Sequence, residues 1–350
     1  MRFLRRFLRG APEPVDNEAR AAEGHAAVAM CWRGDASVPI ADWHALSQHP
    51  DASDASTCDA YWTSAALQWL DAMRSHFDAG YPVARSAHFA LFSAMDARES
   101  RLTLDVCERM RRRVLQALPG VAEDRGHGPH VALVFESIDD YYAYVGNYYA
   151  TAGDYAMSSG MFIQHGYGHF VFVRSEIDAM EPVIAHELTH SLVAHLPIPA
   201  WLNEGVAVST EKALLPHLAD PRMALWTPRE LEAKHAAFWN AQTIQEFWIG
   251  KSFLRPDEGN ALSYDLGERL VRLLARDYAT FATFMNAAGM DDAGLAAARD
   301  VLAVDLGDAV AAILGEGTWR PQPQSWSDGL ERGQFRQPGN ETGATMASRQ

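Results

Sequence analysis

The sequence predicts an α+β fold, in which a small group of strands is accompanied by many helices. Two observations support this prediction. Short apolar and β-branched runs occur between residues 130 and 173, and such runs are typical of buried strands. Segments before and after them carry apolar residues three and four positions apart, which is the pattern of amphipathic helices. Strands that precede a largely helical remainder favour an α+β layout.

The N-terminal part is expected to begin irregularly and to continue with two helices. Residues 1–55 form an irregular lead-in, because most of this stretch is rich in Ala, Asp, Pro and Ser with little periodicity. A first helix is then expected over residues 61–77, where apolar residues recur at spacings of three and four. A second helix is expected from about Asp105 to Leu118, where a Pro-Gly pair ends it.

The strands are expected on both sides of a tyrosine-rich segment. Residues 130–137 form one apolar, β-branched run. Residues 160–176 contain two β-like runs around a glycine-containing turn, and the second of them, residues 170–173, comes directly before the next helix. After Ala207 the pattern is helical again, and residues 319–350 are predicted to be a disordered tail because they are poor in apolar residues.

Composition excludes some classes of function. The formal net charge of −15 over 350 residues disfavours binding to nucleic acid. Three widely spaced cysteines predict neither a disulfide framework nor a thiolate zinc site. No apolar run is long enough for a transmembrane segment, and the first ten residues lack the core of a secretory signal, so we expect a cytoplasmic location. The oligomeric state stays open.

The chemistry is expected in the segment VIAHELTHSLV, which contains His186, Glu187 and His190. Two histidines four residues apart project from one face of a helix and can share one metal ion. Imidazole nitrogen suits Zn²⁺. In an H-E-x-x-H arrangement the glutamate does not bind the metal but faces the metal-bound water, where it can act as a general base. Such a pattern arises by chance on the order of 4 times in 100 chains of this composition.

A third ligand is available downstream. A catalytic zinc site needs three protein ligands and an open position. The segment PAWLNEG provides Glu204, with 13 residues between it and His190. A turn through Pro197 and Pro199 would let a second helix, beginning near Trp201, fold back toward the first and direct Glu204 to the ion.

These two motifs together resemble the gluzincin peptidases, and in particular the compact peptidase MA-like domains. In those domains P-x-W-L-x-E-G-x-A follows the HExxH helix, and here it comprises Pro199, Trp201, Leu202, Glu204, Gly205 and Ala207. The resemblance implies a zincin-like domain over residues 56–318, with a core at 129–210 and a helical part at 211–318. It also implies a small mixed sheet whose edge strand lies over the cleft, and residues 170–173 are the expected edge strand. The implied partner is a peptide or protein substrate.

The resemblance also implies a hydrogen-bond donor to the oxyanion on a later helix, and Tyr264 matches that position. Tyr167 and His169 are weaker candidates for this role. Many relatives carry an acid four residues after the ligand glutamate, where it orients a metal histidine. Val208 stands there in this chain, so Ser209 or Thr210 is expected to take that part.

Three functions remain in competition. A zinc peptidase is favoured, with metal ligands His186, His190 and Glu204 and with catalytic residues Glu187 and Tyr264. A zincin-fold binding or regulatory module that keeps the metal without turnover is the second. The presence of Glu187 argues against this binding module, because a binding site does not require a general base. A metal-dependent hydrolase acting on a non-peptide bond is the third, since the same site polarises any carbonyl group.

Overall fold

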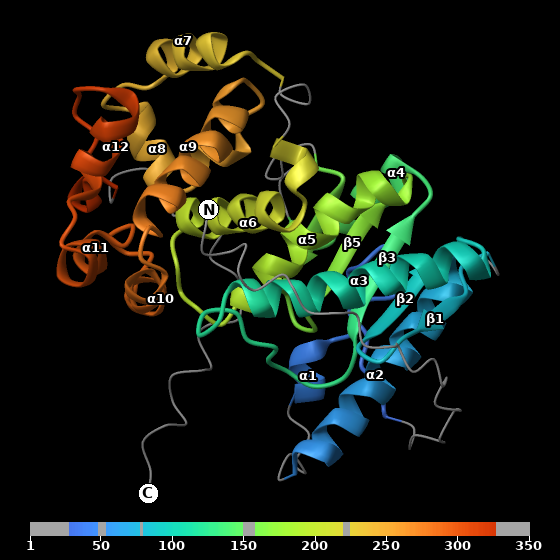
Figure 1. Ribbon diagram of the computed structural model, residues 1–350. Helices are drawn as coiled ribbons and strands as arrows, with labels where there is room; N and C mark the ends of the chain where they lie inside the picture. The colour runs from blue at the N-terminus through green and yellow to red at the C-terminus, as the bar shows by residue number, and fades with distance from the viewer. Residues whose placement is uncertain (1–27, 48–53, 78–79, 150–157, 220–224, 327–350) are drawn as a thin grey trace, which may run out of the picture.

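The computed structural model describes residues 28–47, 54–77, 80–149, 158–219 and 225–326. It has an α+β fold with one five-stranded mixed sheet and many helices, as the sequence predicts. Helices α7 to α12 gather on one side of the molecule, the sheet lies on the other, and α5 and α6 lie between them (Figure 1). The metal-site motifs are therefore at the junction of the sheet and the helical part.

The sheet has the strand order β1-β2-β3-β5-β4. Its central strands β2, β3 and β5 are parallel, while β1 and β4 pair antiparallel at the two edges. The strands are β1 (Val83–Arg85), β2 (Phe89–Ser93), β3 (His130–Phe135), β4 (Gly160–Ile163) and β5 (His169–Val173). The first two strands were not expected from the sequence, because they are short and follow one another closely.

One face of the sheet is covered by α1 (Trp43–Ser47), α2 (Ala55–His76) and α4 (Ile138–Val145). Aromatic residues fill this layer, and the indole nitrogen of Trp69 donates a hydrogen bond to the Pro39 carbonyl oxygen at 2.9 Å. The chain around Pro39 thus packs on α2. Within the expected irregular lead-in, the segment from Val38 to Leu46 therefore contributes buried residues to the core, and residues 1–27 lie outside the described part of the chain.

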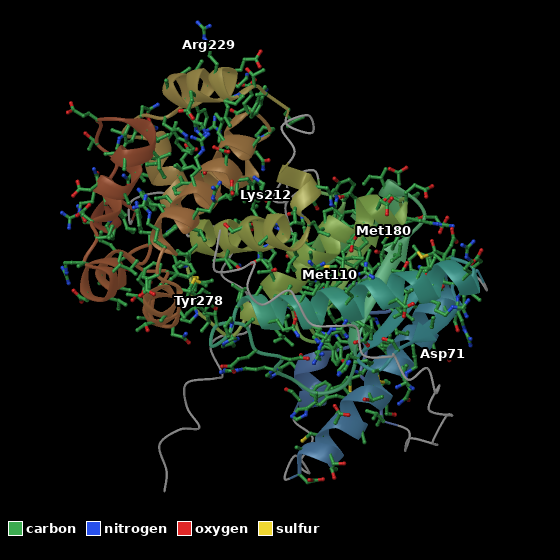
Figure 2. The ribbon with its side chains drawn as sticks, in the orientation of Figure 1. Asp71, Met110, Met180, Lys212, Arg229 and Tyr278 are labelled. Carbon is green, nitrogen blue, oxygen red and sulfur yellow. The ribbon has the colours of Figure 1, made fainter. Side chains whose placement is uncertain are left out.

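The other face is covered by α3 (Ala97–Ala117) and α5 (Ile177–Val193). Met110 of α3 and Met180 of α5 are both buried in this layer (Figure 2). Helix α3 begins eight residues before the expected start, because Asp96 caps it and forms a capping box with Glu99. An acidic cap of this kind marks a helix start even where the apolar pattern is weak.

Helix α5 also begins earlier than the sequence suggests, so that Pro182 lies inside the helix and not in its first turn. A proline at an interior position removes one backbone hydrogen bond. The preceding turn is stabilised by tertiary contacts, since Met180 is buried and Glu181 forms an ion pair with Arg109 of α3 at 2.7 Å. Packing thus outweighs the local preference of proline.

Helix α6 (Ala200–Leu214) follows α5 after a short turn and carries the second motif. The remaining helices are α7 (Pro228–Phe238), α8 (Thr243–Trp248), α9 (Gly259–Leu274), α10 (Tyr278–Ala287), α11 (Leu295–Leu302) and α12 (Leu306–Leu314). Trp319 and Trp326 are buried against this helical part, so ordered packing continues into the first residues of the expected tail. Residues 327–350 lie outside the described part.

The expected edge strand is wrong. Residues 170–173 belong to β5, which lies between β3 and β4, and the edge next to the helix of the metal site is β4. The physical reason is burial: β5 is apolar at nearly every position because both of its faces are covered. Within the described residues, no helix has the length and apolar character required to cross a membrane.

Candidate metal centre

Helix α5 brings two histidines to the same face. His186 and His190 are one turn apart, and their ring centroids lie 4.7 Å from each other. Their side chains are 15% and 13% exposed, so solvent reaches both rings. The rest of the helix supplies buried apolar residues such as Ile184, Leu188 and Leu192, which fix it against the sheet. The pair is thus held on a rigid element.

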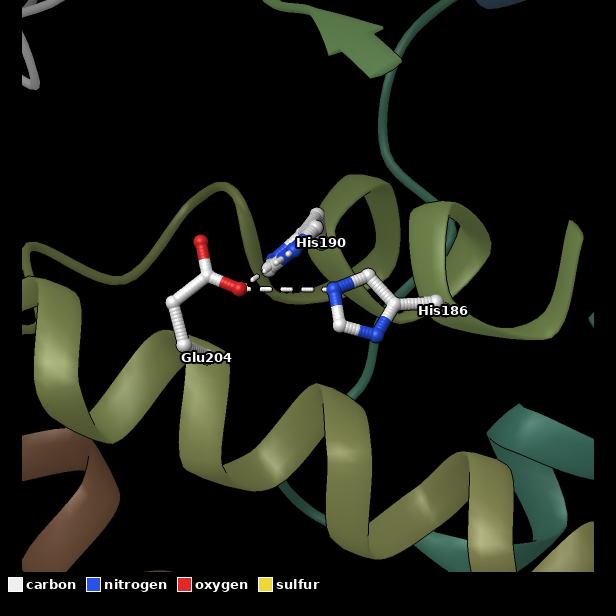
Figure 3. Close-up of side chains that lie close together, drawn as sticks. All are labelled: His186, His190 and Glu204. Carbon is white, nitrogen blue, oxygen red and sulfur yellow. Dashed lines mark hydrogen bonds and ion pairs between the residues drawn. The ribbon is translucent and has the colours of Figure 1, made fainter. Parts of the chain in front are cut away.

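Helix α6 adds a carboxylate to this pair. The Oε2 atom of Glu204 lies 3.3 Å from Nε2 of His186 and 3.4 Å from Nε2 of His190. Figure 3 shows the three side chains directed toward one another from the two helices. One ligand atom from each residue lies within 4.8 Å of the other two, so the group could hold a metal ion. The three predicted ligands are therefore brought together.

The second ring nitrogen of each histidine also has a partner. Nδ1 of His186 lies 3.2 Å from Oε2 of Glu211, and Nδ1 of His190 lies 3.0 Å from Oδ1 of Asn203. Because carboxylate and amide oxygens are acceptors, each Nδ1 carries the proton and donates it. Nε2 of each ring is then the nitrogen that a metal ion would bind, in place of any proton there.

The residues that orient the histidines are not the expected ones. The sequence suggested Ser209 or Thr210, whereas Glu211 and Asn203 make the contacts. The Ser209 hydroxyl is buried and has no hydrogen-bond partner within the described residues. Glu211 lies seven residues after Glu204, which is two helical turns, so helical periodicity on α6 was the signal that could have identified it.

Acidic partners determine the charge of this cluster. Burial alone would lower the pKa of His186, but its hydrogen bonds to Glu204 and Glu211 raise that pKa well above the usual value. The pKa of His190 is also raised, because the charge of Glu204 outweighs the effect of burial. Burial would raise the pKa of Glu204, yet the two histidines lower it. The acidic neighbours thus favour the protonated form of both imidazole rings, and the histidines favour the ionised form of Glu204.

Glu187 lies near both histidines and also contacts the edge of the sheet. It is 8% exposed, and its Oε2 atom accepts a hydrogen bond from the backbone N–H of Phe162 in β4 at 2.7 Å. Its other oxygen, Oε1, has no hydrogen-bond partner among the described residues. One oxygen of Glu187 is therefore fixed by the strand.

Tyr264 lies beside the histidine pair. It is on α9, its ring centroid is 6.3 Å from that of His186, and an edge-to-face contact with Phe253 at 5.1 Å holds the ring. Burial raises the pKa of Tyr264 well above its usual value, and the nearby charges of Glu204 and Glu187 raise it further. The hydroxyl therefore stays protonated and can donate a hydrogen bond.

A close helix crossing places Tyr264 near the cluster. Gly205 of α6 packs directly on Gly267 of α9, since a Cβ atom at Gly205 would lie 2.5 Å from the Gly267 carbonyl oxygen. Gly205 follows the ligand Glu204, and Gly267 is three residues after Tyr264. The absence of side chains at this crossing lets the two helices approach.

The weaker candidates lie elsewhere. His169 is fully buried on the opposite face of the sheet, where the Tyr144 hydroxyl hydrogen-bonds its Nε2 at 2.8 Å. The Tyr167 hydroxyl donates to the Pro129 carbonyl oxygen at 2.5 Å. Neither residue belongs to the group formed by His186, His190 and Glu204.

Comparison with known proteins adds no family assignment, because neither the protein-family models nor the curated protein sequences give a match to this chain.

Proposed function

We propose that the protein is a zinc-dependent peptidase of gluzincin type, in which His186, His190 and Glu204 hold the metal and Glu187 is the general base. One observation carries the proposal: two imidazole nitrogens and one carboxylate oxygen converge beside a second acid, Glu187, that is not part of the cluster. A purely structural metal site has no use for such an acid.

The two separations between Glu204 and the histidine nitrogens agree with zinc. Ligand atoms about 2.0–2.2 Å from a tetrahedral zinc ion lie about 3.4 Å from each other. The separations between Glu204 Oε2 and the two Nε2 atoms are 3.3 and 3.4 Å. Three protein ligands that leave one position open are typical of catalytic zinc sites, whereas structural sites have four.

The proposed roles follow from the positions of the side chains. A zinc ion held here would supply Lewis acidity, which makes a water molecule more acidic and polarises a carbonyl group. Glu187 accepts the proton from this water as its oxygen attacks the carbonyl carbon, and returns it to the amine nitrogen when the C–N bond breaks. Tyr264 donates a hydrogen bond to the carbonyl oxygen while that oxygen carries negative charge.

The substrate class that we propose is an extended peptide. Strand β4 lies at the edge of the sheet and packs next to α5, and its outward Phe162 N–H contacts Glu187. An edge strand binds an extended chain through backbone hydrogen bonds.

Elemental analysis and one hydrolysis assay test the proposal. We expect about one zinc per chain in the wild type and loss of that zinc in Glu204→Ala. Hydrolysis of casein or of a random peptide pool should fall by about 10²–10⁴-fold in Glu187→Gln, which should keep its zinc. Absence of zinc from the wild type would refute the metal site. Zinc without any hydrolysis would favour the binding module.

A further inference from the structure

The backbone register of β4 directs the N–H of Phe162 away from the neighbouring strand. Met161 and Ile163 pair with Val171 and His169 of β5, and the Val173 N–H donates to the Ser159 carbonyl oxygen. In an antiparallel pair, alternate residues exchange hydrogen bonds with the neighbouring strand and the others face away. The N–H of Phe162 therefore points to the open side of the sheet.

This open side is occupied by a side chain of α5. The Phe162 N–H donates to Oε2 of Glu187 at 2.7 Å, although the two residues are 25 positions apart in the chain. An outward amide on an edge strand would otherwise be hydrogen-bonded to water. The contact joins the edge of the sheet directly to the proposed general base.

The close approach of β4 to α5 depends on a residue without a side chain. A Cβ atom at Gly160 would lie 2.4 Å from Cγ1 of Val183, which is three residues before His186 on α5. The Phe162 ring packs against Phe170, with ring centroids 5.2 Å apart. The strand is thus held at a fixed distance from the helix, which fixes the direction of the Phe162 amide.

We propose that the backbone N–H of Phe162 is a positioning group for Glu187: it holds Oε2 so that Oε1 is directed toward the reacting water. The inference rests on the proposed peptidase function and deepens it. It also restricts substrate pairing, because this N–H is already engaged. The outward groups of β4 that an extended peptide can use are then the N–H and C=O of Gly160 and the C=O of Phe162.

A proline substitution isolates this amide. Phe162→Pro removes the N–H without removing a hydrogen bond between strands, because the amide faces away from β5. Phe162→Ala is the matched control, since it loses the same ring and keeps the N–H. We expect both variants to bind zinc. We expect kcat of the proline variant to be about 10–100-fold below that of the alanine variant, with KM changed by less than about twofold.

Equal kcat values in the two variants would overturn the inference, and so would a loss that appears only in KM. A loss of zinc from the proline variant alone would also contradict it, because it would mean that the amide supports the metal site as a whole. These outcomes differ from failure of the proposed function, in which the wild type itself hydrolyses no peptide.

Amide hydrogen exchange gives a readout that does not need activity. In the wild type and in Glu187→Gln, which keeps an acceptor oxygen, the Phe162 amide should be protected. In Glu187→Ala it should exchange roughly tenfold faster or more. The Met161 and Ile163 amides face β5 and serve as internal controls with unchanged rates. Unchanged protection at Phe162 in Glu187→Ala would show that the strand does not hold this side chain.

Discussion

Two pairs of histidines in this molecule have the same spacing in the chain but lie in different environments. His165 and His169 are four residues apart, as are His186 and His190. The second pair lies on a helix, where the rings are neighbours, and its partners are carboxylates and an amide. The first pair spans a turn and the start of β5, and the partners of His169 are a tyrosine hydroxyl and a backbone carbonyl group.

The difference teaches that the partners decide what a buried histidine can do. Burial lowers the pKa of His169 to about 4, because its neutral partners do not compensate for the loss of water. The acids around His186 raise the pKa of that residue in spite of burial. The first environment keeps the ring neutral, whereas the second favours a cation.

The largest expected effect concerns the pH dependence of stability that His169 causes. In the unfolded state the His169 ring binds a proton below about pH 6.5, whereas in the folded state it does so only near pH 4. The contribution of neutral His169 to the free energy of unfolding is therefore complete above pH 6.5. As the pH falls from 6.5 to 4, this contribution is lost, and the free energy of unfolding decreases by roughly 3 kcal/mol. Urea unfolding at several pH values measures this loss.

The control is His169→Gln, which keeps a donor and an acceptor but does not titrate. Its free energy of unfolding should fall less than that of the wild type over the same pH range, with chelator present in both samples. If the two proteins lost the same stability between pH 6.5 and 4, the neutral environment assigned to His169 would be wrong.

A somewhat smaller effect is expected from metal binding at the other pair. Zinc at a hundredfold excess over its dissociation constant should stabilise the folded protein by about 2.7 kcal/mol. Thermal unfolding with zinc and with chelator measures this as a rise in Tm of several degrees. His169→Gln should keep the full rise and Glu204→Ala should lose it. A rise of equal size in Glu204→Ala would place the metal elsewhere.

The smallest effect is expected at the residues that orient the histidines. Glu211→Ala and Asn203→Ala each remove the acceptor for one Nδ1–H and should weaken zinc binding by about 10–100-fold. Competition with a chelator measures the affinity. Ser209→Ala is the matched control on the same helix, because its hydroxyl makes no hydrogen bond within the described residues. Equal losses in all three variants would mean that helix packing, and not these contacts, sets the affinity.

The convergence of His186, His190 and Glu204 could be predicted from the sequence, because it depends on residue spacing along two consecutive helices. The spacing of His186 and His190 determines their common face once the segment is helical, and Glu204 follows on the next helix. The α+β class followed from periodicity in the same way.

The edge of the sheet could not be predicted because it depends on strand order. Strand β5 comes directly before α5 in the chain but lies inside the sheet, while the less apolar β4 forms the edge. Strand order follows from the long-range pairing of β5 with β3, which no local pattern contains. For the same reason, the contact between Phe162 and Glu187 is visible only in the folded chain.

The glycine crossing of α6 and α9 has a consequence for motion. The two backbones are in direct contact at Gly205 and Gly267, with the Val271 side chain beside them, which restricts displacement of one helix along the other. We therefore expect Glu204 and Tyr264, which flank this crossing, to keep their relative position. Displacement within the site is then expected between α5 and β4, where the Phe162 backbone amide contacts Glu187.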